Sequence, residues 1–151
     1  MHGSMRSRLR AWCIMGARRV WRALRPVLAP VWRRHRPVLF AWVDRGLVDV
    51  RASLQAEGLG QARSRLPDPP YAARWLTLLV AARLSMLRAT CLERSLIMQR
   101  WLMANGQPHD VLIGVRSPRE TTIAHAWLDH EDSRSYHVLM RLPPEDAAHA
   151  G

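Results

Sequence analysis

The sequence predicts an α+β fold in which N-terminal helices are followed by a small antiparallel sheet. Apolar residues recur at helical spacing through much of residues 1–104. The segments 109–115, 121–129 and 135–142 are instead short, rich in β-favouring residues and separated by turn residues. A run of helices followed by a run of strands is typical of α+β domains.

The first part of the chain predicts an Arg-rich helical region over residues 1–68. Prolines interrupt its early part, and residues 37–56 predict a helix that stops at Gly58. Three prolines within 65–71 cannot continue a helix and mark a boundary. We expect the next helix over residues 71–87.

The helix that follows carries the clearest local signals. Thr90 and Glu93 have the spacing of a capping box, in which each side chain bonds the backbone N–H of the other residue. Asn105 and Gly106 supply the stop. We therefore predict a helix over residues 91–104.

Positive charge is concentrated at the N-terminus. The 151 residues carry a formal net charge of +11, and residues 1–43 hold ten arginines and no acid. This asymmetry points to a membrane surface, nucleic acid or an acidic partner. Trp12, Trp21, Trp32 and Trp42 recur among the arginines, which suits helices lying on an anionic membrane surface. No recognition motif accompanies the charge, so we do not expect nucleic acid to be the partner.

Several classes of protein are excluded by composition. Two cysteines are too few for a disulfide framework, and no Cys/His spacing predicts a zinc site. The apolar stretch 75–82 is too short to span a bilayer. Arginines interrupt any signal-peptide core. We expect a cytoplasmic protein that needs no metal or cofactor and whose N-terminal helices can associate with a membrane.

Cys91 is the first residue of the predicted helix 91–104. Its sulfur would lie beside backbone N–H groups and the positive end of the helix dipole, which favour a thiolate over a thiol. A thiolate attacks carbonyl carbons, and the same N–H groups can stabilise an oxyanion. The alternative is a small buried side chain, a common role for a free cysteine.

His125 differs from the other six histidines because it lies inside an apolar strand segment, between two alanines. Small neighbours leave its ring accessible, so it is the candidate general base for Cys91; the alternative is a structural histidine. A cysteine that starts a helix, followed by a sheet with a histidine on its second strand, is the order of papain-like and transglutaminase-like sites.

The segments "CLERSLIMQRWLMANGQPHDVLIGV" and "AHAWLD" resemble the transglutaminase-like domain of lasso-peptide maturation proteins. Residues 91–96 follow the family pattern Cys-Leu-x-Arg-(Ser/Ala)-Leu, residues 124–127 give Ala-His-Ala-Trp, and the similarity covers about 75–142. The resemblance implies a papain-like cysteine peptidase that removes the leader from a ribosomally synthesised precursor. In that reaction Cys91 is the nucleophile and His125 the general base.

The resemblance also implies partners and a domain division. An ATP-dependent cyclase closes the lasso after the leader of the precursor peptide is removed. Residues 1–68 show no strand pattern, so a separate leader-recognition protein is expected to deliver the precursor. We assign residues 69–144 to the transglutaminase-like peptidase domain and residues 145–151 to a tail.

The third member of a catalytic triad is less well defined. The family places an acid about a dozen residues after the histidine, where this chain has His137. Asp129 is the candidate orienting acid and Asp132 the alternative, both in the segment "DHEDSRS", which we expect to be a hairpin connection. At about 3.3 Å per residue, Asp129 would lie roughly 13 Å from His125. Ordinary turn acids are the other interpretation.

Arg94 and Trp127 are candidate substrate contacts. Arg94 can hold a substrate carboxylate or pair with an acid, and Trp127 is equally consistent with a core position. The short hairpin favours a rival hypothesis, in which a catalytically degenerate scaffold presents the precursor to the cyclase. A further rival is a basic adaptor for a membrane surface or nucleic acid.

Overall fold

The computed structural model describes residues 33–64, 66–116, 122–131 and 135–144. The chain divides into two compact units, residues 1–37 and 38–151. Residues 38–68 belong to the same compact unit as the sheet, and the predicted division at residue 68 stays a prediction. No helix in the described ranges is long and apolar enough to cross a membrane.

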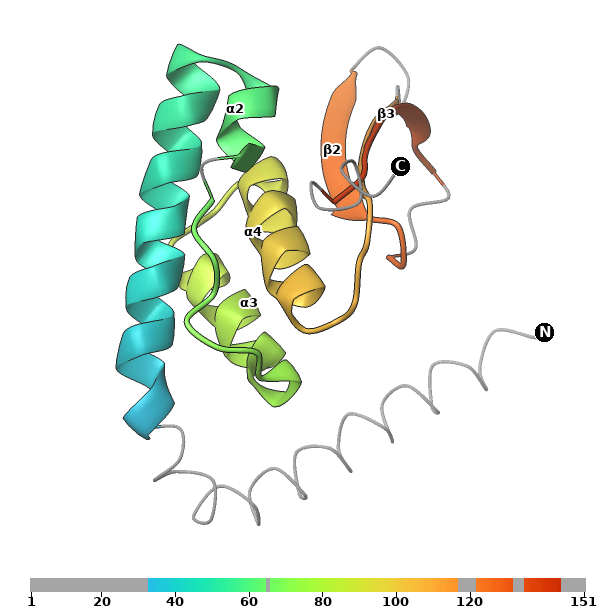
Figure 1. The fold of residues 1–151 in the computed structure, drawn as a ribbon. Helices are drawn as coiled ribbons and strands as arrows, with labels where there is room; N and C mark the ends of the chain where they lie inside the picture. The colour runs from blue at the N-terminus through green and yellow to red at the C-terminus, as the bar shows by residue number, and fades with distance from the viewer. Residues whose placement is uncertain (1–32, 65, 117–121, 132–134, 145–151) are drawn as a thin grey trace, which may run out of the picture. The chain divides into compact units, whose positions relative to one another are not determined.

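The helices follow the expected order with one addition (Figure 1). Residues 33–56 are helical, and the stop comes where Gly58 adopts a φ of +83°, which glycine reaches without strain. A short helix α2, Leu59–Ser64, follows and was not predicted.

The next two helices are α3 and α4. A 3₁₀ turn, Arg74–Leu76, leads into α3, Thr77–Met86. This helix starts later than the predicted residue 71. Helix α4 spans Cys91–Ala104, which confirms the predicted bounds.

The sheet has three antiparallel strands in the order β2-β1-β3. They are β1 (Val111–Arg116), β2 (Ile123–Leu128) and β3 (His137–Leu142). Because β3 pairs with β1 and not with β2, the segment between β2 and β3 is a crossover, and the predicted hairpin was wrong. The first residues of β1 are buried, as suits a central strand, whereas β3 is exposed along almost its whole length.

Gly114 allows β1 to approach the β3 backbone and the Trp127 side chain closely. The register of β1 with β3 shifts between Ile113 and Gly114. A Cβ at Gly114 would lie 2.5 Å from the His137 carbonyl oxygen and 2.7 Å from a ring carbon of Trp127. Only glycine fits here, and its missing side chain leaves room for the indole of Trp127.

Helix α4 lies at the centre of the domain. It contacts α3 on one side and β2 and β1 on the other. The indole of Trp101 is fully buried and donates a hydrogen bond to the Thr77 hydroxyl at 2.9 Å. The largest fully buried apolar side chains come from the first helix, the α3 region, α4 and β1: Leu39, Val43, Val50, Leu76, Val80, Leu84, Leu96, Ile97, Trp101 and Val111.

A buried glutamine fixes α4 against the sheet. The Gln99 side chain is 6% exposed, and its Nε2 donates to the His109 carbonyl at 2.8 Å and to the Leu142 carbonyl at 2.9 Å. These acceptors lie just before β1 and at the end of β3. One side chain thus ties the helix to both strands, which sets the position of α4 relative to the sheet.

Candidate functional site

Cys91 occupies the capped first turn of α4. The Thr90 hydroxyl accepts from the Glu93 N–H at 3.3 Å, and the Glu93 carboxylate accepts from the Thr90 N–H at 2.7 Å. The predicted capping box is confirmed. Just upstream, Arg88 adopts a φ of +53°, which turns the chain sharply between α3 and α4. Cys91 is a free, half-buried thiol at the end of this turn.

Glu93 links the start of α4 to the first helix. Its carboxylate is 8% exposed and accepts from the Arg51 guanidinium at 2.9 and 3.3 Å. Burial alone would raise the pKa of Glu93, but the hydrogen bonds from Arg51 and the Thr90 backbone hold it below its ordinary value. An ionised Glu93 therefore anchors the turn that carries Cys91.

A cleft of about 240 Å³ lies between the start of α4 and strand β2. The structure brings both proposed catalytic residues to its wall, one from each element. Its lining residues are Cys91, Arg94, Ser95, Met98, His125, Ala126, Leu128 and Glu131. A thiol at a helix N-terminus and an imidazole on the facing wall are the groups that acyl transfer requires.

The cleft follows an outer edge of the sheet, because β2 pairs only with β1 in the order β2-β1-β3. Side chains alternate along a strand, so His125 shares one face with Trp127, and Ala126 shares the other with Leu128. Residues of both faces line the cleft, as expected for a hollow at a strand edge. The Leu128 backbone is not free to pair with another strand there. Its N–H donates to the Glu131 carboxylate, and its C=O accepts from the Glu131 N–H.

The His125 ring packs among aromatic side chains. It stacks on Trp127 with a centroid separation of 5.8 Å and an interplanar angle of 13°, and it lies 5.2 Å from the Tyr136 ring. Within the described residues, no hydrogen bond joins this ring to the Cys91 thiol. Trp127 is 2% exposed and does not line the cleft. It packs against the His125 ring, and its role as a substrate contact stays a prediction.

Asp129 does not contact His125. Its carboxylate lies 2.8 Å from Nδ1 of His109, and hydrogen bonding to His109 and to the Asp110 backbone outweighs the effect of burial and lowers the pKa of Asp129. The reason is geometric. Asp129 lies just after the end of β2, whereas His125 lies inside the strand, where it pairs with Gly114. Asp132, the alternative acid, lies outside the described residues.

Glu131 lines the cleft and was not predicted as a site residue from the sequence. It sits in the same segment as Asp129 and Asp132, and its carboxylate accepts from the Leu128 N–H at 3.1 Å. Sequence spacing carries no signal for this role, because Glu131 reaches the cleft only through the turn after β2. Arg94 also lines the cleft, is exposed, and lies 3.5 Å from the Ser85 hydroxyl.

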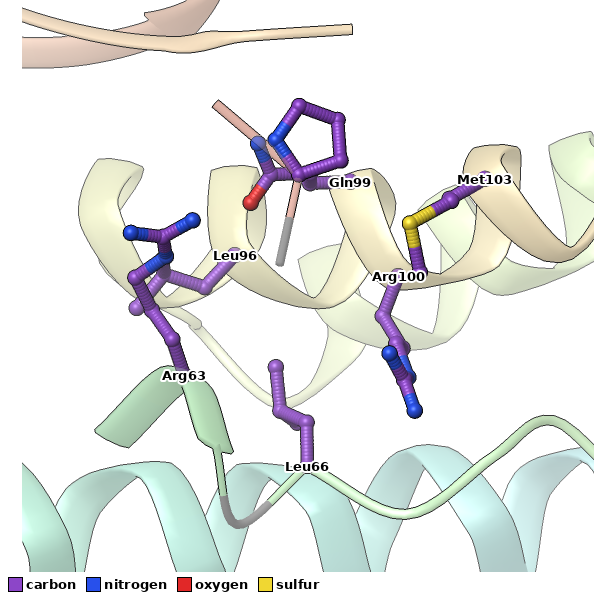
Figure 2. Close-up of a pocket in the computed structure, with 7 residues that line it drawn as sticks. Arg63, Leu66, Leu96, Gln99, Arg100 and Met103 are labelled. Atoms are coloured by element: carbon purple, nitrogen blue, oxygen red, sulfur yellow. The ribbon is translucent and has the colours of Figure 1, made fainter. Parts of the chain in front are cut away.

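A second hollow lies on a different face of α4 (Figure 2). It measures about 20 Å³, which is room for about one water molecule and too small for a peptide. Arg63 and Leu66 border it from α2 and the segment after it, and α4 contributes the other wall with Leu96, Gln99, Arg100 and Met103. Neither Cys91 nor His125 lines it, so it is not part of the candidate site.

Residues 32–138 match the family described as the transglutaminase-like superfamily. The match includes α4, the cleft and most of the sheet, and it extends over more than half of the chain. The chain therefore belongs to the transglutaminase-like superfamily, whose members are typically cysteine-protease-like enzymes. No curated protein and no solved structure matches the chain.

Proposed function

We propose that this protein is a cysteine peptidase that removes the leader from a ribosomally synthesised lasso-peptide precursor. The observation that carries the proposal is the shared cleft. Cys91, at the capped start of α4, and His125, on the edge strand β2, line the same hollow in a domain of the transglutaminase-like superfamily. The resemblance of residues 91–96 and 124–127 to the lasso family supplies the substrate class.

The chemistry follows from the two side chains. The Cys91 sulfur attacks the carbonyl carbon at the leader–core junction, and His125 takes the thiol proton. The N–H groups at the start of α4 stabilise the oxyanion. His125 then gives the proton to the departing core amine, which leaves the leader as a thioester on Cys91. Water, deprotonated by His125, hydrolyses the thioester and restores the thiol.

The ring of His125 must approach the thiol for this reaction. Catalytic hydrogen bonds are often loose without substrate and tighten when it binds. Trp127 and Tyr136 pack against the ring, and neither of them lines the cleft. Among the residues that the structure describes, the ring is held by aromatic packing and no carboxylate bonds to it; such a histidine suffices as a base because a cysteine is intrinsically nucleophilic.

The edge of β2 suits an extended peptide. In an antiparallel ladder, alternate residues direct their N–H and C=O groups away from the partner strand. The Leu128 groups that point outward are taken by Glu131, so the outward groups of Ala126 and Ala124 are the next along the edge. A substrate that pairs there as an added strand passes beside His125.

Partners and location follow from the same proposal. A separate recognition protein delivers the leader, and an ATP-dependent cyclase receives the core. The protein works in the cytoplasm, and the ten arginines of residues 1–43 hold it at an anionic membrane surface or an acidic partner.

A cleavage assay tests the proposal. The precursor is incubated with the recognition protein, the cyclase and each variant, and the products are read by mass spectrometry. Cys91→Ala and His125→Ala abolish leader removal, whereas the matched controls Cys13→Ala and His137→Ala retain it. Equal leader removal by wild type and Cys91→Ala would refute the proposal.

A scaffold is the second candidate function. It is favoured by one observation, namely that in the described residues His125 bonds to neither the thiol nor a carboxylate. In that case the cleft binds the precursor and presents it to the cyclase without cutting it. The two functions separate in the same assay, because a scaffold supports lasso formation equally well with Cys91→Ala.

A further inference from the structure

Three ligating side chains gather outside the cleft, at the end of the sheet where β1 begins and β2 ends. Nδ1 of His109 lies 2.8 Å from Oδ1 of Asp129. The His109 and His130 rings lie 4.2 Å apart at their centroids, tilted by 44°. One potential ligand atom from each of the three residues lies within 4.8 Å of those of the other two.

The fold fixes the backbone that carries these side chains. β1 and β2 are antiparallel and pair Val111 with Leu128, so the residues just outside this pair meet at one end of the ladder. The Asp129 N–H donates to the Asp110 carbonyl at 3.0 Å, and Gln99 holds the His109 carbonyl at 2.8 Å. The cluster is therefore a product of strand register, which sequence spacing did not reveal.

The spacing of the ligand atoms suits a transition-metal ion. Tetrahedral zinc with bonds of about 2.0–2.1 Å to nitrogen and oxygen keeps its ligand atoms roughly 3.4 Å apart. The separations in the cluster, 2.8 Å for one pair and at most 4.8 Å for any pair, bracket that value.

We propose that His109, Asp129 and His130 form a binding site for a divalent transition-metal ion of the zinc type. Two imidazoles and one carboxylate select such ions over magnesium and calcium, which prefer oxygen ligands. The His109 and Asp129 side chains are 23% and 33% exposed, so an ion has an entry path and water can complete its coordination.

The site shares its turn with the cleft. Leu128 and Glu131, which line the cleft, flank Asp129 and His130 in the sequence. A bound ion joins this turn to His109 before β1 and so stabilises the wall of the cleft beside β2. The metal site itself does not depend on the proposed peptidase activity.

Isothermal titration of the full-length, tag-free protein with zinc chloride tests the site. We expect one zinc ion per chain with an affinity that falls more than about tenfold in His109→Ala, Asp129→Asn and His130→Ala. His137→Ala, an exposed histidine on β3, is the matched control and leaves the affinity unchanged. Thermal melts should show zinc stabilising the wild type but not His130→Ala, with equal melting temperatures for the two without metal.

Three results would overturn the site. A wild-type protein that does not bind zinc would refute the proposed site directly. Binding that persists in His130→Ala but is lost in Cys91→Ala places the ion at the thiol. Calcium binding as tight as zinc binding would show that carboxylates of the turn hold the ion without a contribution from the imidazoles.

Discussion

Glu93→Gln is the perturbation that tests how the start of α4 is held. The glutamine keeps the size of the side chain and one acceptor oxygen, but it loses the charge that meets Arg51 and the Thr90 N–H. Hydrogen bonds to a charged group contribute about 1.5–3 kcal/mol. Because the Arg51 side chain is 44% exposed, solvent screens the pair and the lower value, about 1.5 kcal/mol, applies.

The expected loss of stability can be measured by thermal unfolding at neutral pH. For a chain of this size, about 1.5 kcal/mol lowers the melting temperature by about 3–6 °C. Asp49→Asn is the matched control. Within the described part of the chain, Asp49 forms an exposed pair with Arg45 at 3.9 Å and no other ion pair, so this change should cost less than about 0.5 kcal/mol.

The same variant has a defined pH dependence. The pKa of Glu93 is lowered in the folded protein, so its stabilising effect is complete above the ordinary glutamate pKa of about 4.3. The effect is lost as the pH falls through the lower folded-state pKa. The difference between wild type and Glu93→Gln should therefore shrink in acid. A variant as stable as wild type at pH 7, or a difference that stays constant into strong acid, would refute this reasoning.

Three further predictions concern the sheet, the helix contact and the N-terminus. Gly114→Ala forces a Cβ against the His137 carbonyl and should cost about 1–3 kcal/mol in chemical denaturation, whereas Gly60→Ala, with open space, should be near neutral. Gln99→Ala leaves two carbonyls without their buried donor and should cost about 2 kcal/mol or more, against little for Gln107→Ala; equal costs would contradict the anchoring role. Removal of residues 1–37 should leave a cooperative thermal unfolding transition and peptide cleavage by the rest but abolish sedimentation with anionic vesicles, and unchanged sedimentation would refute membrane docking.

Local signals in the sequence were enough to place α4 and Cys91. The capping box and the Asn105–Gly106 stop act within a few residues, so both ends of the helix are as predicted. The strands were located, but their order was not. Pairing of β3 with β1 depends on which strand is buried most, and this is decided by packing between distant parts of the chain.

The candidate site was predictable to the same extent. Cys91 and His125 could be selected from motif and strand context, and the structure places both on one cleft. The role of Glu131 and the contact of Asp129 with His109 were not predictable, because each depends on the turn after β2 and on strand register.

The covalent intermediate offers the most direct test of the peptidase assignment. Wild-type protein is mixed with precursor and recognition protein, quenched in acid within a single turnover, and analysed by intact and peptide mass spectrometry. The proposed mechanism predicts the leader acyl group as a thioester on the peptide that contains Cys91, with no such adduct on Cys13 or in Cys91→Ala. Leader removal that proceeds equally in Cys91→Ala, with no adduct in the wild type, would contradict it.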